Sequence, residues 1–150
     1  MSVSGGGGPM RYAVAKGGAE RFVEGRRSYI RYRDLEVAGA SGGRFGGTVH
    51  RATGEPIQST GWHYHVCEAQ LTYVLTGWAD LEFGDGTTVR IEAGDAVFIP
   101  GGVRHIERAA SPDIEVIEYT VPAEIGTVEC DGPGPDVDLS TLDLAEPPPR

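Results

Sequence analysis

Two short segments decide the fold of this chain: His63-Tyr-His65 and Gly94-Asp-Ala-Val-Phe-Ile-Pro-Gly-Gly-Val-Arg-His105. Residues two apart in a β-strand project from the same face, so His63 and His65 can reach one metal ion together. His105 would add a third imidazole from another strand. The spacing therefore predicts a metal site built on β-structure.

The rest of the sequence also favours strands joined by tight turns. Its 150 residues include 23 glycines and 10 prolines, and the apolar residues come in short runs rich in Val, Ile, Tyr and Phe. We expect about nine short strands, near 28–37, 44–52, 61–66, 70–75, 79–83, 87–92, 96–99, 104–109 and 114–121. The dipeptide Asp85-Gly86 between two of them is a strong hairpin signal. This pattern predicts an all-β sandwich or barrel in a single domain.

The two ends of the chain differ in composition from the middle. Residues 1–10 are mostly glycine and serine, and we expect a disordered arm there. Residues 126–150 should form an acidic tail rich in proline and glycine. Neither segment carries enough apolar surface to fold alone. The domain is therefore expected at residues 11–125, with an N-terminal extension before the barrel.

Charge and hydropathy exclude several classes of partner. The formal net charge of −9 argues against nucleic acid, because phosphate binding needs a basic surface. Seven of the 13 basic residues lie between Arg11 and Arg33. We expect ordinary solvated strand and loop edges there, the alternative being a surface for a partner or an anionic ligand.

No apolar run approaches the roughly 20 residues that would span a membrane. The first ten residues also lack the charged and then apolar pattern of a leader. We therefore expect a cytoplasmic protein with no membrane partner. Cys67 and Cys130 are too few for a disulfide framework and should stay reduced.

Both histidine segments resemble the two motifs of the cupin family. The first family motif is His-x-His, four residues, Glu, six residues and Gly. It is similar to the run His63, His65, Gln70 and Gly77, with glutamine in place of glutamate. The second family motif, Gly-x5-Pro-x-Gly-x2-His, is matched in full by Gly94, Pro100, Gly102 and His105.

This resemblance covers roughly residues 28–121 and implies a double-stranded β-helix, a jelly-roll-like barrel. It further implies a divalent metal ion, such as Fe, Ni, Zn or Mn, held by His63, His65, Gln70 and His105. A neutral amide is a weaker ligand than a carboxylate, so this set should favour a divalent ion over a ferric one. Glu68 could supply a carboxylate instead of Gln70. The family also implies a homodimer formed through sheet edges.

Other side chains could join the same cavity. His50 could point into it, although we expect a place on the strand surface. Candidates for the pocket walls are Tyr73, Phe98, Arg104 and Tyr119. Arg104 could bind a substrate carboxylate, although a surface salt bridge is the expected role. Cys67 could lie near the metal, or be a small buried residue.

Two functions stay open at this point. The first is a metal-dependent enzyme that acts on a small oxygen-bearing substrate, with dioxygenase chemistry ahead of isomerase or lyase chemistry. The alternative is a non-catalytic module that binds a small molecule or a metal, because this architecture hosts many activities. No nucleophilic triad, phosphate-binding loop or carboxylate pair stands out in the sequence, so any chemistry should depend on the metal.

Overall fold

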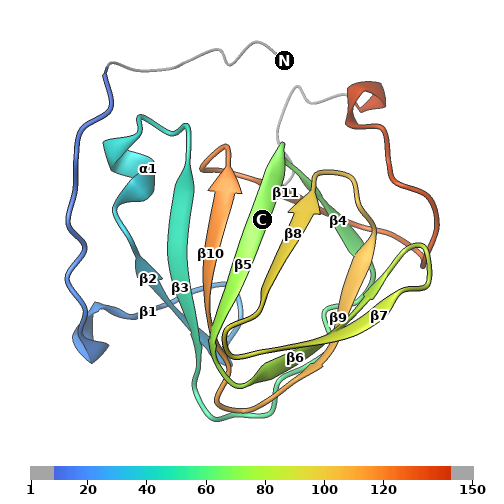
Figure 1. The fold of residues 1–150 in the computed structure, drawn as a ribbon, viewed down its shortest axis with the longest axis horizontal. Helices are drawn as coiled ribbons and strands as arrows, with labels where there is room; N and C mark the ends of the chain where they lie inside the picture. The colour runs from blue at the N-terminus through green and yellow to red at the C-terminus, as the bar shows by residue number, and fades with distance from the viewer. Residues whose placement is uncertain (1–8, 143–150) are drawn as a thin grey trace.

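Two antiparallel β-sheets face each other in this computed structural model, which describes residues 9–142 (Figure 1). The first sheet has the order β1 (Val23–Glu24), β2 (Ile30–Asp34), β3 (Gly46–Ala52), β10 (Glu115–Val121), β5 (Ala69–Thr76) and β8 (Ala96–Pro100). The second has the order β11 (Gly126–Glu129), β4 (His63–Val66), β9 (His105–Ala110), β6 (Trp78–Phe83) and β7 (Thr88–Glu92). Three short helices complete the described chain: η1 (Ala19–Arg21), α1 (Val37–Ala40) and η2 (Leu139–Thr141). The all-β prediction is confirmed.

Every expected strand is present, and the largest difference lies at the end of the first one. That strand was expected to reach Val37, but β2 ends at Asp34. The Asp34 carboxylate accepts a hydrogen bond of 2.9 Å from the backbone N–H of Glu36. Glu36 has a left-handed backbone, with φ of 65°. A side chain that bonds its own backbone two residues on makes a turn, so the strand stops and α1 follows.

The Asp85-Gly86 hairpin joins β6 to β7 as the sequence predicts. Gly86 has φ of 91°, which glycine adopts without steric cost. The Asp85 carboxylate accepts a hydrogen bond of 2.9 Å from the N–H of Thr87. The ladder then runs from Glu82 opposite Thr88 to Trp78 opposite Glu92.

The inner faces of the two sheets form the core. Along β5 the inward side chains of Gln70 and Val74 are buried, whereas Leu71, Tyr73 and Leu75 are exposed on the outer face. The inward residues form an apolar cluster of Val74, Ala79, Leu81, Ile91 and Ile114. The cluster draws on both sheets, so burial of its apolar surface holds them together.

Residues beyond 125 contribute to the barrel. The acidic tail was predicted to begin at Gly126, but residues 126–129 form β11, which pairs with β4. Further on, the N–H of Gly134 donates to the carbonyl of Gly84 at 3.1 Å, and the N–H of Val137 to that of Gly102 at 2.9 Å. Backbone hydrogen bonds thus hold this part of the chain on the barrel. Most of the predicted N-terminal arm, and residues 143–150, lie outside the described residues.

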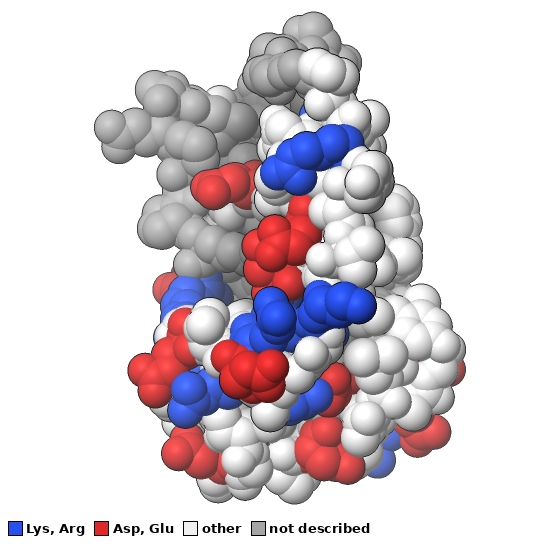
Figure 2. Space-filling view, turned by 90° about the vertical axis from the view of Figure 1, so that its left-hand side faces the viewer, with Lys and Arg blue, Asp and Glu red and all other residues white. Residues whose placement is uncertain are grey.

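Charges of both signs mix on the side of the molecule that carries the N-terminal strands (Figure 2). Arg31 pairs with Glu24 at 3.5 Å, and Arg51 pairs with Glu115 at 3.0 Å. Most of this face is therefore a mixed, solvated surface of the expected kind. No helix in the described part of the chain is both long and apolar enough to cross a membrane.

Candidate metal centre

Three histidine side chains converge where β4 meets β9. His63 and His65 project from one face of β4, and His105 begins β9 as the Cα partner of His63. Ligand atoms of the three side chains all lie within 4.8 Å of one another. The tertiary structure thus brings these three histidines together, and the group could hold a metal ion.

Backbone carbonyls fix the orientation of two of the rings. The Nδ1 atom of His63 lies 2.8 Å from the carbonyl oxygen of Gly61, and that of His105 lies 2.9 Å from the carbonyl of Val103. A carbonyl oxygen only accepts, so each Nδ1 carries a proton and Nε2 is left as the ligand atom of the ring. The Nε2 of His105 is buried and has no hydrogen-bond partner among the described residues. A buried, unpartnered lone pair is costly unless something binds it, which fits a metal ion.

His65 receives its support from β11. Its Nδ1 atom lies 3.1 Å from the hydroxyl oxygen of Thr127. Burial, and then the neighbouring His105 and His63, lower the pKa of His65 to about 3. Burial also lowers the pKa of His105. Both imidazoles are therefore neutral near pH 7, which is the form that binds metals.

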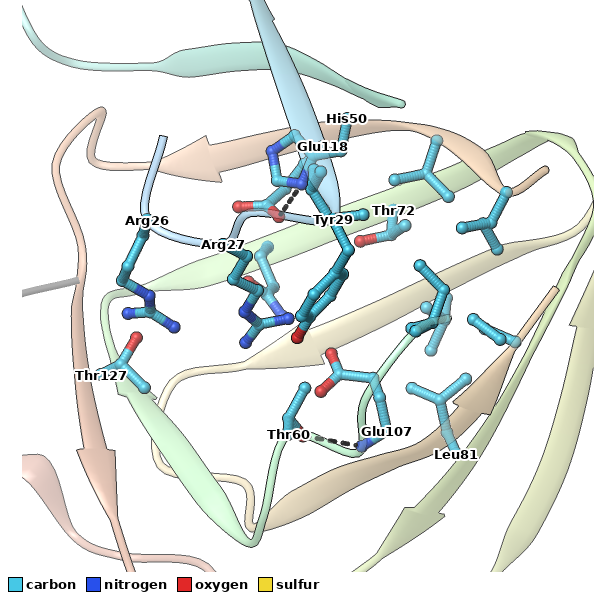
Figure 3. A pocket seen from close by; sticks show the side chains of 18 of the residues that line it. Arg26, Arg27, Tyr29, His50, Thr60, Thr72, Leu81, Glu107, Glu118 and Thr127 are labelled. Carbon is cyan, nitrogen blue, oxygen red and sulfur yellow. Dashed lines mark hydrogen bonds and ion pairs between the residues drawn. The ribbon is translucent and has the colours of Figure 1, made fainter. Parts of the chain in front are cut away.

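A carboxylate that the sequence analysis missed lies beside the histidines. Glu107 follows His105 by two residues on β9, and its Oε2 atom is 3.7 Å from the Nε2 of His63. The side chain is 36% exposed, yet Oε2 itself is buried, with no hydrogen-bond partner in the part of the chain that the structure describes. Thr60 fixes the backbone, because its hydroxyl accepts a hydrogen bond of 3.1 Å from the N–H of Glu107 (Figure 3). The signal for Glu107 was available: a residue two after His105 on a strand shares its face.

Glu107 is ionised in this setting. Burial raises the pKa of its carboxyl, but His63, His105, Thr60 and Arg27 together outweigh that effect and lower the pKa below its ordinary value. The site therefore contains a carboxylate even though the expected glutamate position holds glutamine.

Gln70 and Glu68 occupy different environments. Gln70 on β5 is only 6% exposed and lines the same pocket as His63 and His65. Glu68 is exposed and lies outside both the pocket lining and the histidine group. Of these two candidates, only Gln70 faces the site.

His63 and His65 line a cavity of about 390 Å³ between the sheets. Figure 3 shows this cavity from close by. His50 lines this cavity rather than the strand surface that we expected. Its cross-strand partners, Tyr32 and Val116, line the cavity too, so all three share the inner face. The Nε2 of His50 lies 2.9 Å from the hydroxyl of Thr48, and its Nδ1 lies 3.7 Å from the Glu118 carboxylate.

Several other candidates for the pocket lie elsewhere. Tyr73, Phe98 and Tyr119 are exposed on the outer face of their sheet. Strand periodicity explains this, since Tyr73 is an odd number of residues from Gln70. Arg104 donates a hydrogen bond of 3.0 Å to the carbonyl of Pro135 instead of reaching the cavity. Cys67 is partly buried and lies outside the histidine group.

Comparisons with known proteins agree with this architecture. The family model described as "Cupin domain" matches residues 50–121. The structure of KdgF from Halomonas sp. is similar with a TM-score of 0.61 and 20% identity, over 75% of this chain and 96% of that one. The polyketide cyclase RemF from Streptomyces resistomycificus has a TM-score of 0.51 and 29% identity, over 65% of this chain and 68% of that one.

A predicted oxalate decarboxylase from Thermotoga maritima has a TM-score of 0.52 and 23% identity, over 62% of this chain and 80% of that one. No curated protein matches the sequence. The structural likenesses identify the double-stranded β-helix, whereas the reaction depends on the residues of the site.

Proposed function

This chain belongs to the cupin superfamily, and from that premise we propose that it is a metal-dependent enzyme acting on a small oxygen-bearing substrate. One observation carries the proposal: the buried Nε2 atom of His105 has no partner among the described residues and converges with the ligand atoms of His63 and His65. Three imidazoles that meet around one point suit a divalent ion such as Fe, Ni, Zn or Mn.

His63, His65, Gln70 and His105 would hold the ion, with the Glu107 carboxylate beside them. A divalent ion bound there would polarise a substrate oxygen or, if it is redox-active, bring O₂ and the substrate together. Groups of the protein itself orient the ligands and form the cavity. The carbonyls of Gly61 and Val103 hold two of the rings in place, and aliphatic side chains line part of the cavity.

Dioxygenase chemistry is our first reaction class, and isomerase or lyase chemistry is the second. RemF, at 29% identity, is named a polyketide cyclase, and this likeness supports keeping the second class open. A cupin that binds a small molecule or metal without turnover is the alternative, and the experiment below separates it from an enzyme.

We also propose a homodimer formed through the outer face of the six-stranded sheet. Leu71 is the cross-strand partner of both Phe98 and Tyr119, and all three side chains are exposed. A contiguous apolar patch of this kind is uncommon on a monomer. Light scattering should give a dimer for the wild type and a monomer for Phe98→Asp.

We further propose a cytoplasmic location, which the reduced state of Cys67 and Cys130 supports.

The decisive experiment is elemental analysis of the purified protein beside His105→Ala. His50→Ala is the matched control, because His50 lines the cavity but lies outside the histidine group. We expect near-stoichiometric metal in the wild type and in the control, and loss of metal in His105→Ala. If the metal is iron, the next measurement is O₂ consumption with candidate substrates. If it is nickel, zinc or manganese, the next measurement is turnover of lyase and isomerase substrates. No metal, even after reconstitution, would contradict the enzyme proposal and leave a binding module.

A further inference from the structure

We propose that Arg26 and Arg27 bind an anionic group of the substrate, which makes the substrate an organic acid with an apolar body. The inference rests on the proposed function only in placing the substrate in this cavity. It adds the substrate class, which neither the family nor the metal group specifies.

Both arginines lie in the loop between β1 and β2, at the mouth of the cavity. The loop is held at both ends: Val23 and Glu24 pair with Tyr32 and Arg31, and the N–H of Ile30 donates to the carbonyl of Arg27 at 3.1 Å.

Gly25 contributes by packing against the ring of Tyr32, where a Cβ atom would overlap the ring. These contacts fix the loop above the cavity, and Figure 3 shows Arg26, Arg27 and Tyr29 extending from it.

The two guanidinium groups are also close to the histidine group. Arg26 and Arg27 line the main cavity and a second hollow that adjoins it. His63 and Thr127 line both spaces as well. An anionic group held by the arginines would therefore leave the adjoining part of the substrate beside the histidines.

The guanidinium groups of Arg26 and Arg27 have no direct partner within the described structure. Neither makes a side-chain hydrogen bond or an ion pair with a described residue, whereas nearby Arg31 pairs with Glu24 at 3.5 Å. Arg27 acts only at longer range, as one of the groups that lower the pKa of Glu107. Acidic groups do line the two spaces, namely Glu107, Glu118 and Glu129. Glu107 is turned toward His63, and Glu118 toward His50. Two adjacent guanidinium groups without partners suit a carboxylate or a phosphate.

Beyond this charged mouth, aliphatic side chains form a large part of the cavity wall. Its walls include Ile57, Leu81, Ile91, Val97, Ile99 and Ile114. A cavity of about 390 Å³ is in the range that holds a small organic ligand, and a two-carbon acid would leave most of the apolar wall uncovered. The acid that fits best therefore has a hydrocarbon or aromatic body.

The test compares probes that share one apolar body. 1-Naphthoate and 1-naphthyl phosphate carry the anion, 1-naphthamide is neutral, and acetate lacks the body. Affinities are measured by calorimetry on metal-loaded and on chelator-treated protein. We expect one of the two naphthyl anions to bind about tenfold or more tighter than the amide, because hydrogen bonds to charged groups are the strong ones. The preferred anion identifies carboxylate or phosphate.

The variant Arg26→Gln/Arg27→Gln should lose this preference for the anion and keep its affinity for the amide. Arg31→Gln is the matched control, since Arg31 lies on β2 outside the cavity lining, and it should behave like the wild type. Circular dichroism confirms that each variant is folded.

Three results would overturn the inference: equal affinity for anion and amide, an anion preference that survives in the double variant, or no binding of any naphthyl probe at millimolar concentration. If the preference for the anion disappears on chelation but not in the double variant, the metal ion and not the two arginines binds the anion. Metal content of the same samples tests the proposed function separately. A protein without metal can still show the arginine-dependent preference, so the two failures are distinguishable.

Discussion

His63 on β4 and His105 on β9 are Cα partners, and their ring centroids lie 4.3 Å apart. The same two residues therefore pair β4 with β9 and contribute to the histidine group that could hold a metal ion. A metal ion bound to both rings would cross-link the strands at this point, so metal binding and barrel stability should be coupled.

Metal loading should accordingly stabilise the fold. At a free metal concentration of 100 times Kd, binding to the native state alone adds about 2.7 kcal/mol to the free energy of unfolding. Differential scanning calorimetry of loaded and chelated protein measures this gain. His105→Ala should abolish the difference, and a gain of equal size in that variant would contradict the coupling.

Gln70→Glu should retain metal longer against a chelator. The substitution replaces a neutral amide by a carboxylate at a buried position that faces the cavity, and carboxylate is the stronger ligand. Gln58→Glu is the matched control, because Gln58 is exposed at the rim of the same cavity. Equal retention in the wild type and Gln70→Glu would remove Gln70 from the ligand set.

Glu107→Gln should weaken metal binding about tenfold or more, the usual cost of losing a supporting group near a metal site. The change keeps the size of the side chain but removes the charge beside His63. Glu129→Gln removes a carboxylate from the lining of the second hollow and should bind metal as the wild type does. Competition with a fluorescent chelator gives both affinities, and equal values would show that Glu107 does not support the ion.

Gly77→Ala should destabilise the protein more than Gly86→Ala. Both glycines have positive φ, at 79° and 91°, so each substitution costs about 1 kcal/mol in backbone strain. A Cβ atom at Gly77 would also overlap the side chains of Ser111 and Asp113, whereas one at Gly86 meets open space. Urea unfolding of the two variants measures the difference, and equal losses would mean that the neighbours of Gly77 move aside freely.

The strands and the histidine grouping could be predicted because both depend on short-range patterns. Alternation of apolar residues and turn residues such as Asp85-Gly86 act within a few positions of the chain. His63 and His65 share a face for the same reason. Two expectations were wrong, namely that Tyr73 forms a pocket wall and that His50 lies on the strand surface. A correct prediction of either requires knowing which face of the strand turns inward.

The sequence by itself determined the strands, the turns and the pair of histidines on β4, because these follow from local backbone geometry. Only the tertiary structure decided what meets across the barrel. It brought Glu107 to 3.7 Å from His63, turned His50 inward, folded residues 126–129 into β11 and placed Arg26 and Arg27 at the mouth of the cavity. These relationships depend on how two sheets pack face to face, which is set by burial of the whole apolar core and not by any one segment.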